Sequence, residues 1–155
     1  MLEGGDFDWL HLAAHGHFYP DAPDLDAALW LQDGRSLTPD AIVGPQIEAH
    51  LKQVRPAFMF NACHGGRLGW AMTGLGGWAN RLISGGAGLF LAPLWTVTDE
   101  QAARFAVHFY DQLFAGDTIA DAVRAARLAA RRAGDPTWLA YSVYAHPNAR
   151  LLPGA

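Results

Sequence analysis

The sequence contains little cysteine, little charge and no long apolar run. Its 155 residues include a single cysteine, Cys63, so no disulfide can form within the chain and a disulfide-stabilised secreted fold is excluded. The longest apolar run, residues 86–97, is too short for a membrane-spanning helix, which needs about 20 residues. The first eight residues hold three acids and no basic residue, which is unlike a signal peptide. We therefore expect a soluble, cytoplasmic protein.

The charge balance and the apolar content exclude two further classes of protein. A net charge of −4 provides no positive surface for nucleic acid or for an anionic membrane, so neither is an expected partner. Hydrophobic residues make up 51% of the chain, which excludes a disordered protein. Charged residues make up 17%, against about 25% in an average globular domain, which suggests extra buried or partner-facing surface. The length is that of one domain.

Short apolar strands alternate with helices along the chain. The expected strands are 10–14, 57–62, 88–92 and 141–145, and a small hairpin of 28–31 and 35–37 surrounds the Asp33-Gly34 turn. The expected helices are 38–53, interrupted at Gly44-Pro45, then 78–84, 98–114 and 117–134, whereas the glycine-rich stretch 65–77 is expected to be a loop. This alternation predicts an α/β fold with a mostly parallel sheet and helices on both faces.

Two of these strands end at a chemically reactive residue that glycine follows. His15 precedes Gly16, and Cys63 precedes His64-Gly65-Gly66. Ligands gather beyond the carboxyl ends of parallel strands, and neighbouring strands lie about 4.8 Å apart, so the two side chains can lie close together. A nearby imidazole activates a thiol as a nucleophile. The structural alternative is that Cys63 is an inert buried thiol and His15 a hydrogen-bonded histidine at a strand end.

The motif around the cysteine is more specific than either residue alone. Asn61-Ala62-Cys63-His64-Gly65 lies with its cysteine 48 residues after His15, and caspases carry Gln-Ala-Cys-x-Gly about 50 residues after a histidine. Together with four further segments, this motif resembles the CHAT domain, a branch of the caspase-like cysteine peptidase superfamily that also includes separase. The segments that carry the resemblance, in the family's order, are Leu12–Gly16, Phe60–Cys63, Leu94–Asp99, Phe109-Tyr110 and Ala120–Ala126.

The resemblance implies a three-layer caspase-like sandwich and a cysteine endopeptidase that hydrolyses peptide bonds through an acyl-enzyme. It assigns Cys63 as the nucleophile and His15 as the base, and it implies no cofactor. The family's histidine is the one followed by glycine, which selects His15 over His11 and His17. The backbone N–H groups of Gly16 and Cys63 are the implied oxyanion donors.

The sequence departs from the family's pattern at two points. Position 64 is commonly acidic or small in the family, and here it is His64. The family's fold also has two further strands before the histidine strand, for which the residues before Phe7 are too few. We therefore expect residues 1–155 to be the C-terminal portion of a CHAT-type domain, lacking its first strands and leaving an exposed sheet edge. The implied partners are a protein or peptide substrate and an upstream helical-repeat or sensor module. A catalytically silent interaction module is the alternative function.

Asp99 has two interpretations that the sequence leaves open. It is an acid at the start of a predicted helix, where a carboxylate caps the helix or complements its dipole. In separase-like relatives, the acid at the matching Leu-Trp-x-Val-Thr-Asp position lies in the pocket for a basic side chain. The resemblance thus implies that Asp99 binds Arg or Lys before the cleaved bond.

Other candidate sites are weaker. A zinc site could draw its ligands from His11, His15, His17, Cys63 and His64. The spacing of these residues matches no zinc-binding motif, so we expect no metal. Gly74–Ala79 is similar to a dinucleotide-binding loop but begins about a dozen residues after its strand, which excludes it. The tryptophans are expected in the core or at its rim, except that Trp70 and Trp78 either line a groove or pack under the loop. The arginines of the last helix are expected to form a solvated stripe; they are Arg124, Arg127, Arg131 and Arg132.

Overall fold

The computed structural model describes residues 7–17, 28–31, 33–42, 44–63, 77–95 and 97–151, and for residues 15–17, 62 and 63 it describes the backbone alone. The chain divides into two compact units, one of residues 1–96 with 142–144 and one of residues 97–141 with 145–155. Within the described ranges, no helix is both long enough and apolar enough to cross a membrane.

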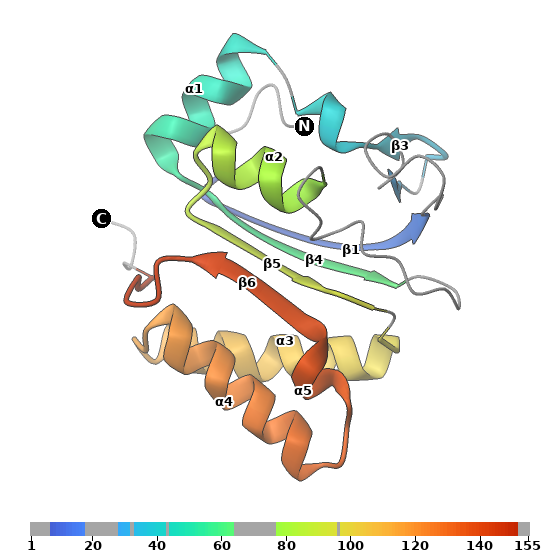
Figure 1. The fold of residues 1–155 in the computed structure, drawn as a ribbon, viewed down its shortest axis with the longest axis vertical. Helices are drawn as coiled ribbons and strands as arrows, with labels where there is room; N and C mark the ends of the chain where they lie inside the picture. The colour runs from blue at the N-terminus through green and yellow to red at the C-terminus, as the bar shows by residue number, and fades with distance from the viewer. Residues whose placement is uncertain are drawn as a thin grey trace. The chain divides into compact units, whose positions relative to one another are not determined.

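The first unit is built on a six-stranded sheet with strand order β3-β2-β1-β4-β5-β6 (Figure 1). The strands are β1 (Trp9–His17), β2 (Ala28–Trp30), β3 (Ser36–Leu37), β4 (Ala57–Cys63), β5 (Leu89–Pro93) and β6 (Tyr141–Ala145). The central strands β1, β4 and β5 run parallel, and the short hairpin β2–β3 adds to β1 in the antiparallel direction. The predicted α/β class with a mostly parallel sheet is therefore confirmed, and it is compatible with a caspase-like sandwich.

Strand β1 is longer than the sequence predicts. It continues past the expected end at Ala14 to His17, because β2 pairs with its last residues: His15 lies opposite Trp30, and Gly16 lies opposite Leu29. A partner strand forms hydrogen bonds with backbone N–H and C=O groups that would otherwise lack a partner within the sheet. The exposed edge expected beside the histidine strand thus carries β2 at its carboxyl end, and the outermost strands of the sheet are β3 and β6.

One face of the sheet carries α1 (Pro45–Val54) and α2 (Trp78–Gly85), after a single 3₁₀ turn, η1 (Pro39–Ala41) (Figure 1). The expected interruption of the helix 38–53 is confirmed, and it separates η1 from α1. Gly44 has a φ of 115°, which side chains rarely tolerate, and Pro45 then starts α1 in the first turn, where its missing N–H costs nothing.

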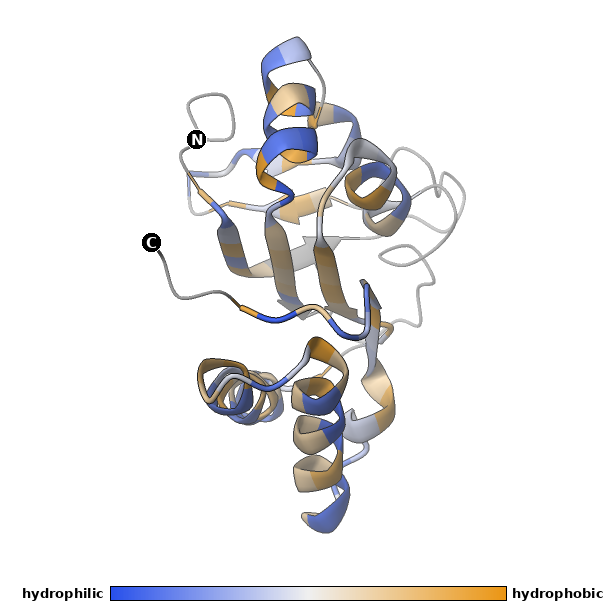
Figure 2. Cartoon of the chain, turned by 90° about the vertical axis from the view of Figure 1, so that its left-hand side faces the viewer, coloured by the Kyte–Doolittle hydropathy of each residue, from blue (hydrophilic) through white to orange (hydrophobic). Residues whose placement is uncertain are grey.

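The core on this face is built around Phe60 of β4. Its ring meets the rings of Phe58, Trp78 and Phe90 edge to face at centroid distances of 6.2, 5.1 and 5.3 Å. Phe60 is 1% exposed and Trp78 is fully buried. In Figure 2, stretches of the central strands are accordingly orange, the colour of hydrophobic residues. Of the two expectations for Trp78, packing is the correct one, because this side chain belongs to the core.

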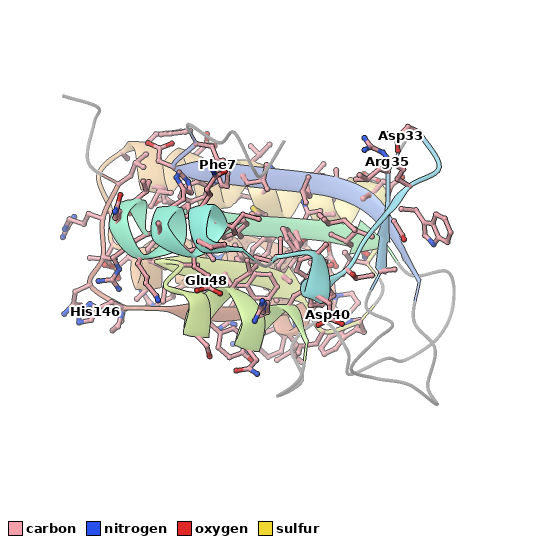
Figure 3. The ribbon with its side chains drawn as sticks, turned by 90° about the horizontal axis from the view of Figure 1, so that it is seen from above. Phe7, Asp33, Arg35, Asp40, Glu48 and His146 are labelled. Atoms are coloured by element: carbon pink, nitrogen blue, oxygen red, sulfur yellow. The ribbon has the colours of Figure 1, made fainter. Side chains whose placement is uncertain are left out.

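Polar contacts fix the segments around β1 (Figure 3). Before the strand begins, the carbonyl oxygen of Phe7 lies 2.8 Å from Nε2 of His50 on α1, and the two rings are 4.8 Å apart. In the β2–β3 turn, Arg35 donates from Nε to Oδ2 of Asp33 at 2.6 Å, which holds the pKa of Asp33 below its ordinary value. The Asp33-Gly34 turn predicted from the sequence is thereby confirmed.

The second unit contains α3 (Asp99–Phe114), α4 (Ile119–Arg132) and the short α5 (Thr137–Ala140). Thr98 begins α3 through a capping box: its hydroxyl accepts from the backbone N–H of Gln101, whose side chain accepts from the N–H of Thr98. Thr118 caps α4 by accepting from the N–H of Asp121. Both hydroxyls satisfy helical N–H groups that lack a partner within the helix, which is why the helices begin at these residues.

Not every arginine of α4 belongs to a solvated stripe. Arg127 is half-buried and donates from Nη2 to the carbonyl oxygen of Tyr141 at 2.7 Å. Arg131 lies over the ring of Trp138 at 5.2 Å from its centroid. The expected stripe is therefore wrong for Arg127, because a backbone carbonyl at the end of α5, a helix the sequence did not predict, lies within its reach.

Candidate active site

Strands β1 and β4 bring together the two residues that the sequence singled out. They run side by side in parallel (Figure 1). Their residues pair one to one from Trp9 opposite Ala57 to His15 opposite Cys63. Because neighbouring strands lie about 4.8 Å apart, this register places the backbones of His15 and Cys63 next to each other. Cys63 is the last residue of β4. His15 lies inside β1 rather than at its end, since the hairpin extends that strand.

The remaining residues of the expected site lie partly outside the described residues. Gly16 follows His15 within β1, in register with Leu29 of β2. Residues 64–76 are outside the described ranges, and these include His64, Trp70 and the start of the segment 74–79. The oxyanion role of the Gly16 and Cys63 N–H groups stays a prediction.

A buried polar pair lies on the same two strands. Asn61 of β4 is 8% exposed, and its Nδ2 lies 3.1 Å from Nε2 of His11 on β1. Part of the His11 ring is open to solvent, and burial of the rest lowers the pKa of this histidine, which favours its neutral form. No role was predicted for this pair from the sequence. The sequence did carry a signal. Asn61 lies two residues before Cys63, and His11 lies four before His15. Because side chains alternate along a strand, each pair shares one face of its strand.

Asp99 lies in the first turn of α3, in the second unit, and is exposed. A carboxylate in this position complements the positive end of the helix dipole. The cap itself is Thr98, so the structure agrees with the first-turn interpretation of Asp99. Its role toward a basic substrate side chain is a separate matter and stays a prediction.

The zinc hypothesis draws on residues that the structure describes only in part. Among the described side chains there is no group of three or more histidine, cysteine, aspartate or glutamate residues placed to hold a metal ion. Of the five proposed ligands, His11 alone has a described side chain, and this side chain is hydrogen-bonded to Asn61.

Comparison with known proteins identifies the family. The sequence model of the CHAT domain matches residues 1–149, which is nearly the whole chain. The chain belongs to the CHAT domain family. A comparison with curated proteins gave no match. The CHAT domain is related to the caspase-like cysteine peptidases, and the resemblance drawn from the sequence motifs is thus confirmed at the level of the family.

Two of the CHAT motifs have a structural role that the fold makes plain. In the motif 120–126, Ala122 and Ala126 are fully buried on α4. Their small side chains suit the close packing of α4 against α3, which includes Phe105 and Phe109 in its buried face. In the motif 60–63, Phe60 anchors β4 in the core. Asn61 of the same motif is a polar residue on this buried strand.

Proposed function

We propose that this CHAT domain is a cysteine endopeptidase in which Cys63 is the nucleophile and His15 the general base. The observation that carries the proposal is the strand register, which makes these two residues direct neighbours on parallel strands. Cys63 is also the only cysteine of the chain. A thiol at the end of one parallel strand, next to a histidine on the neighbouring strand, supports a role in nucleophilic catalysis.

The reaction would follow the usual two steps of acyl transfer. The imidazole of His15 takes the proton of the Cys63 thiol, and Sγ forms a bond to the carbonyl carbon of the substrate peptide. The C–N bond then breaks, and His15 returns the proton to the leaving amine, so that a thioester remains on Cys63. A water molecule, deprotonated by His15, attacks this thioester. The S–C bond then breaks, the carboxylic acid is released, and His15 returns the proton to Sγ, which restores the thiol. The N–H groups of Gly16 and Cys63 would stabilise the oxyanion in both steps.

An electrophilic peptide probe tests the catalytic assignment. A peptidyl acyloxymethyl ketone should label the wild-type chain, and it should not label Cys63→Ala. His15→Ala keeps the cysteine but loses the base, so its labelling should fall at least about tenfold. A matched control is His50→Ala, which removes a hydrogen-bonded histidine from α1 in the same unit and should label like wild type. Equal labelling of wild type and His15→Ala would favour the silent interaction module instead.

Asp99 supplies the proposed preference for a basic residue before the cleaved bond. Asp99 is exposed at the start of α3, and a carboxylate forms strong charge-assisted hydrogen bonds with Arg and Lys side chains. A fluorogenic peptide panel tests this proposal: arginine and lysine peptides should be cleaved fastest, and Asp99→Asn should reduce this advantage. Thr98 keeps α3 capped in that variant. A panel in which acidic or apolar residues are preferred contradicts the proposal.

A further inference from the structure

Asn61 is an amide that directly follows core residues of strand β4. Its neighbours Phe58, Met59 and Phe60 are at most 1% exposed, and Asn61 itself is 8% exposed. Asparagine is disfavoured in strands, and a buried amide costs free energy unless its donors and acceptors are satisfied. Its amide nitrogen, Nδ2, lies 3.1 Å from Nε2 of His11. This hydrogen bond satisfies one donor of the buried amide and links β4 to β1.

The hydrogen bond between Asn61 and His11 has one consistent set of donors and acceptors. Nδ2 of an amide can only donate, so Nε2 of His11 accepts and carries no proton. The ring of His11 is then neutral, with its proton on Nδ1, and the lowered pKa of His11 preserves this form at neutral pH. The bond therefore fixes the orientation of the Asn61 amide plane.

The strand register puts Asn61 between two histidine positions. Asn61 pairs with Ala13. Because side chains alternate along a strand, positions 11 and 15 are on the same face of β1 as Ala13, one before it and one after it. Each of these positions is two residues from Ala13, a distance of about 6.6 Å along the strand. The oxygen of a planar amide points away from its nitrogen. With Nδ2 turned toward position 11, Oδ1 is turned toward the carboxyl end of β1, where position 15 lies.

We propose that Asn61 is the positioning residue of the proposed dyad: its Oδ1 accepts a hydrogen bond from Nδ1–H of His15, and His11 holds the amide in the orientation that this requires. The inference rests on the proposed function, since His15 acts as a base only if Cys63 is a nucleophile. An acceptor on Nδ1 leaves Nε2 free to take the thiol proton, and it stabilises the imidazolium that forms. Asn61 thereby completes a cysteine, histidine and asparagine arrangement on two adjacent strands.

The pH dependence of cysteine alkylation tests this role on the full chain. Iodoacetamide reacts with the thiolate, and with a single cysteine in the chain its rate reports on Cys63 alone. Asn61→Leu removes the acceptor and keeps the branched shape and the number of side-chain heavy atoms. The alkylation rate at pH 6 should fall about tenfold, which corresponds to a thiol pKa about one unit higher, while the rate at pH 9.5 stays unchanged. Asn61→Asp keeps an acceptor in the same place and should stay within about threefold of wild type at pH 6.

Two histidine variants complete the experiment. His11→Ala removes the acceptor of the Nδ2 hydrogen bond that orients the amide, and the alkylation rate of this variant at pH 6 should fall about threefold. This variant changes a side chain that is open to solvent, so it decides the matter even where Asn61→Leu does not fold, as judged by circular dichroism and thermal melting. His50→Ala breaks the bond to the Phe7 carbonyl at the other end of β1, and it should leave the profile unchanged.

The outcomes separate this inference from the proposed function. If wild type reacts readily at pH 6 and His15→Ala does not, the dyad stands, and unchanged profiles in Asn61→Leu or His11→Ala then overturn the positioning role alone. Asn61→Asp reacting as slowly as Asn61→Leu also overturns it, because the shared acceptor would then have no effect. If wild type itself titrates as an ordinary thiol and His15→Ala changes nothing, the proposed function fails, and this inference fails with it.

Discussion

Replacement of Phe60 by alanine measures how strongly the core holds strand β4. The Phe60 side chain is 1% exposed and meets three aromatic rings edge to face at 5.1 to 6.2 Å. Truncating a buried phenylalanine costs about 3–5 kcal/mol, and the loss of favourable ring pairs places this site at the upper end of that range. We expect the free energy of unfolding to fall by about 4–5 kcal/mol. This is a large part of the total for a typical domain, which is about 5–15 kcal/mol.

Urea unfolding followed by tryptophan fluorescence provides the assay, because Trp78 is fully buried against Phe60. Phe114→Ala is the matched control: it makes the same chemical change at a side chain that is 72% exposed. Phe114 stacks on Tyr110 at 5.9 Å, a helical contact worth about 0.5 kcal/mol or less. A cost below about 1 kcal/mol for Phe60→Ala, or equal costs for the two variants, would refute this account of the core.

Three further predictions concern a cap, a glycine and a histidine. Thr98→Ala removes the hydroxyl that accepts from the N–H of Gln101 and should lower the free energy of unfolding by about 1 kcal/mol in urea titrations, whereas Thr98→Ser should cost little. Gly86 has a φ of 117°, and a Cβ there would lie 2.9 Å from the carbonyl oxygen of Leu51, so Gly86→Ala should cost more than about 1 kcal/mol and lower Tm; an unchanged Tm contradicts it. Burial lowers the pKa of His11 in the folded state below its ordinary value of 6.5, so the unfolded chain binds more protons and stability is lost as the pH falls below 6.5. Urea midpoints measured at pH 7.5 and at about pH 5 should show this loss in wild type and a smaller loss in His11→Ala. Equal losses in the two proteins would contradict this prediction.

Local signals account for most of the elements that the sequence predicted correctly. Thr98 and Thr118 carry side-chain oxygens that satisfy the first N–H groups of a helix, and that chemistry involves residues only three apart. The Asp33-Gly34 turn is likewise local. The buried strands of the sheet were visible as apolar runs because a parallel sheet is buried on both faces. Each of these features depends only on a few neighbouring residues.

Features that depend on distant residues were missed. The extension of β1 to His17 requires β2, which follows a segment of ten residues, and nothing within β1 itself indicates that partner. Arg127 reaches a carbonyl 14 residues away, and Asn61 bonds to His11 across 50 residues. The pairing of His15 with Cys63 was nevertheless anticipated, because the carboxyl ends of adjacent parallel strands meet at one edge of a sheet.

The rate at which iodoacetamide alkylates Cys63 at pH 6, compared between wild type and His15→Ala, tests the central claim most directly. It needs no knowledge of the substrate, and the single cysteine makes the signal unambiguous. If His15 activates Cys63, the wild-type cysteine reacts at least about tenfold faster than the cysteine of the variant. Equal rates, with both profiles following an ordinary thiol of pKa about 8.5, would contradict the assignment of His15 and Cys63 as a catalytic pair.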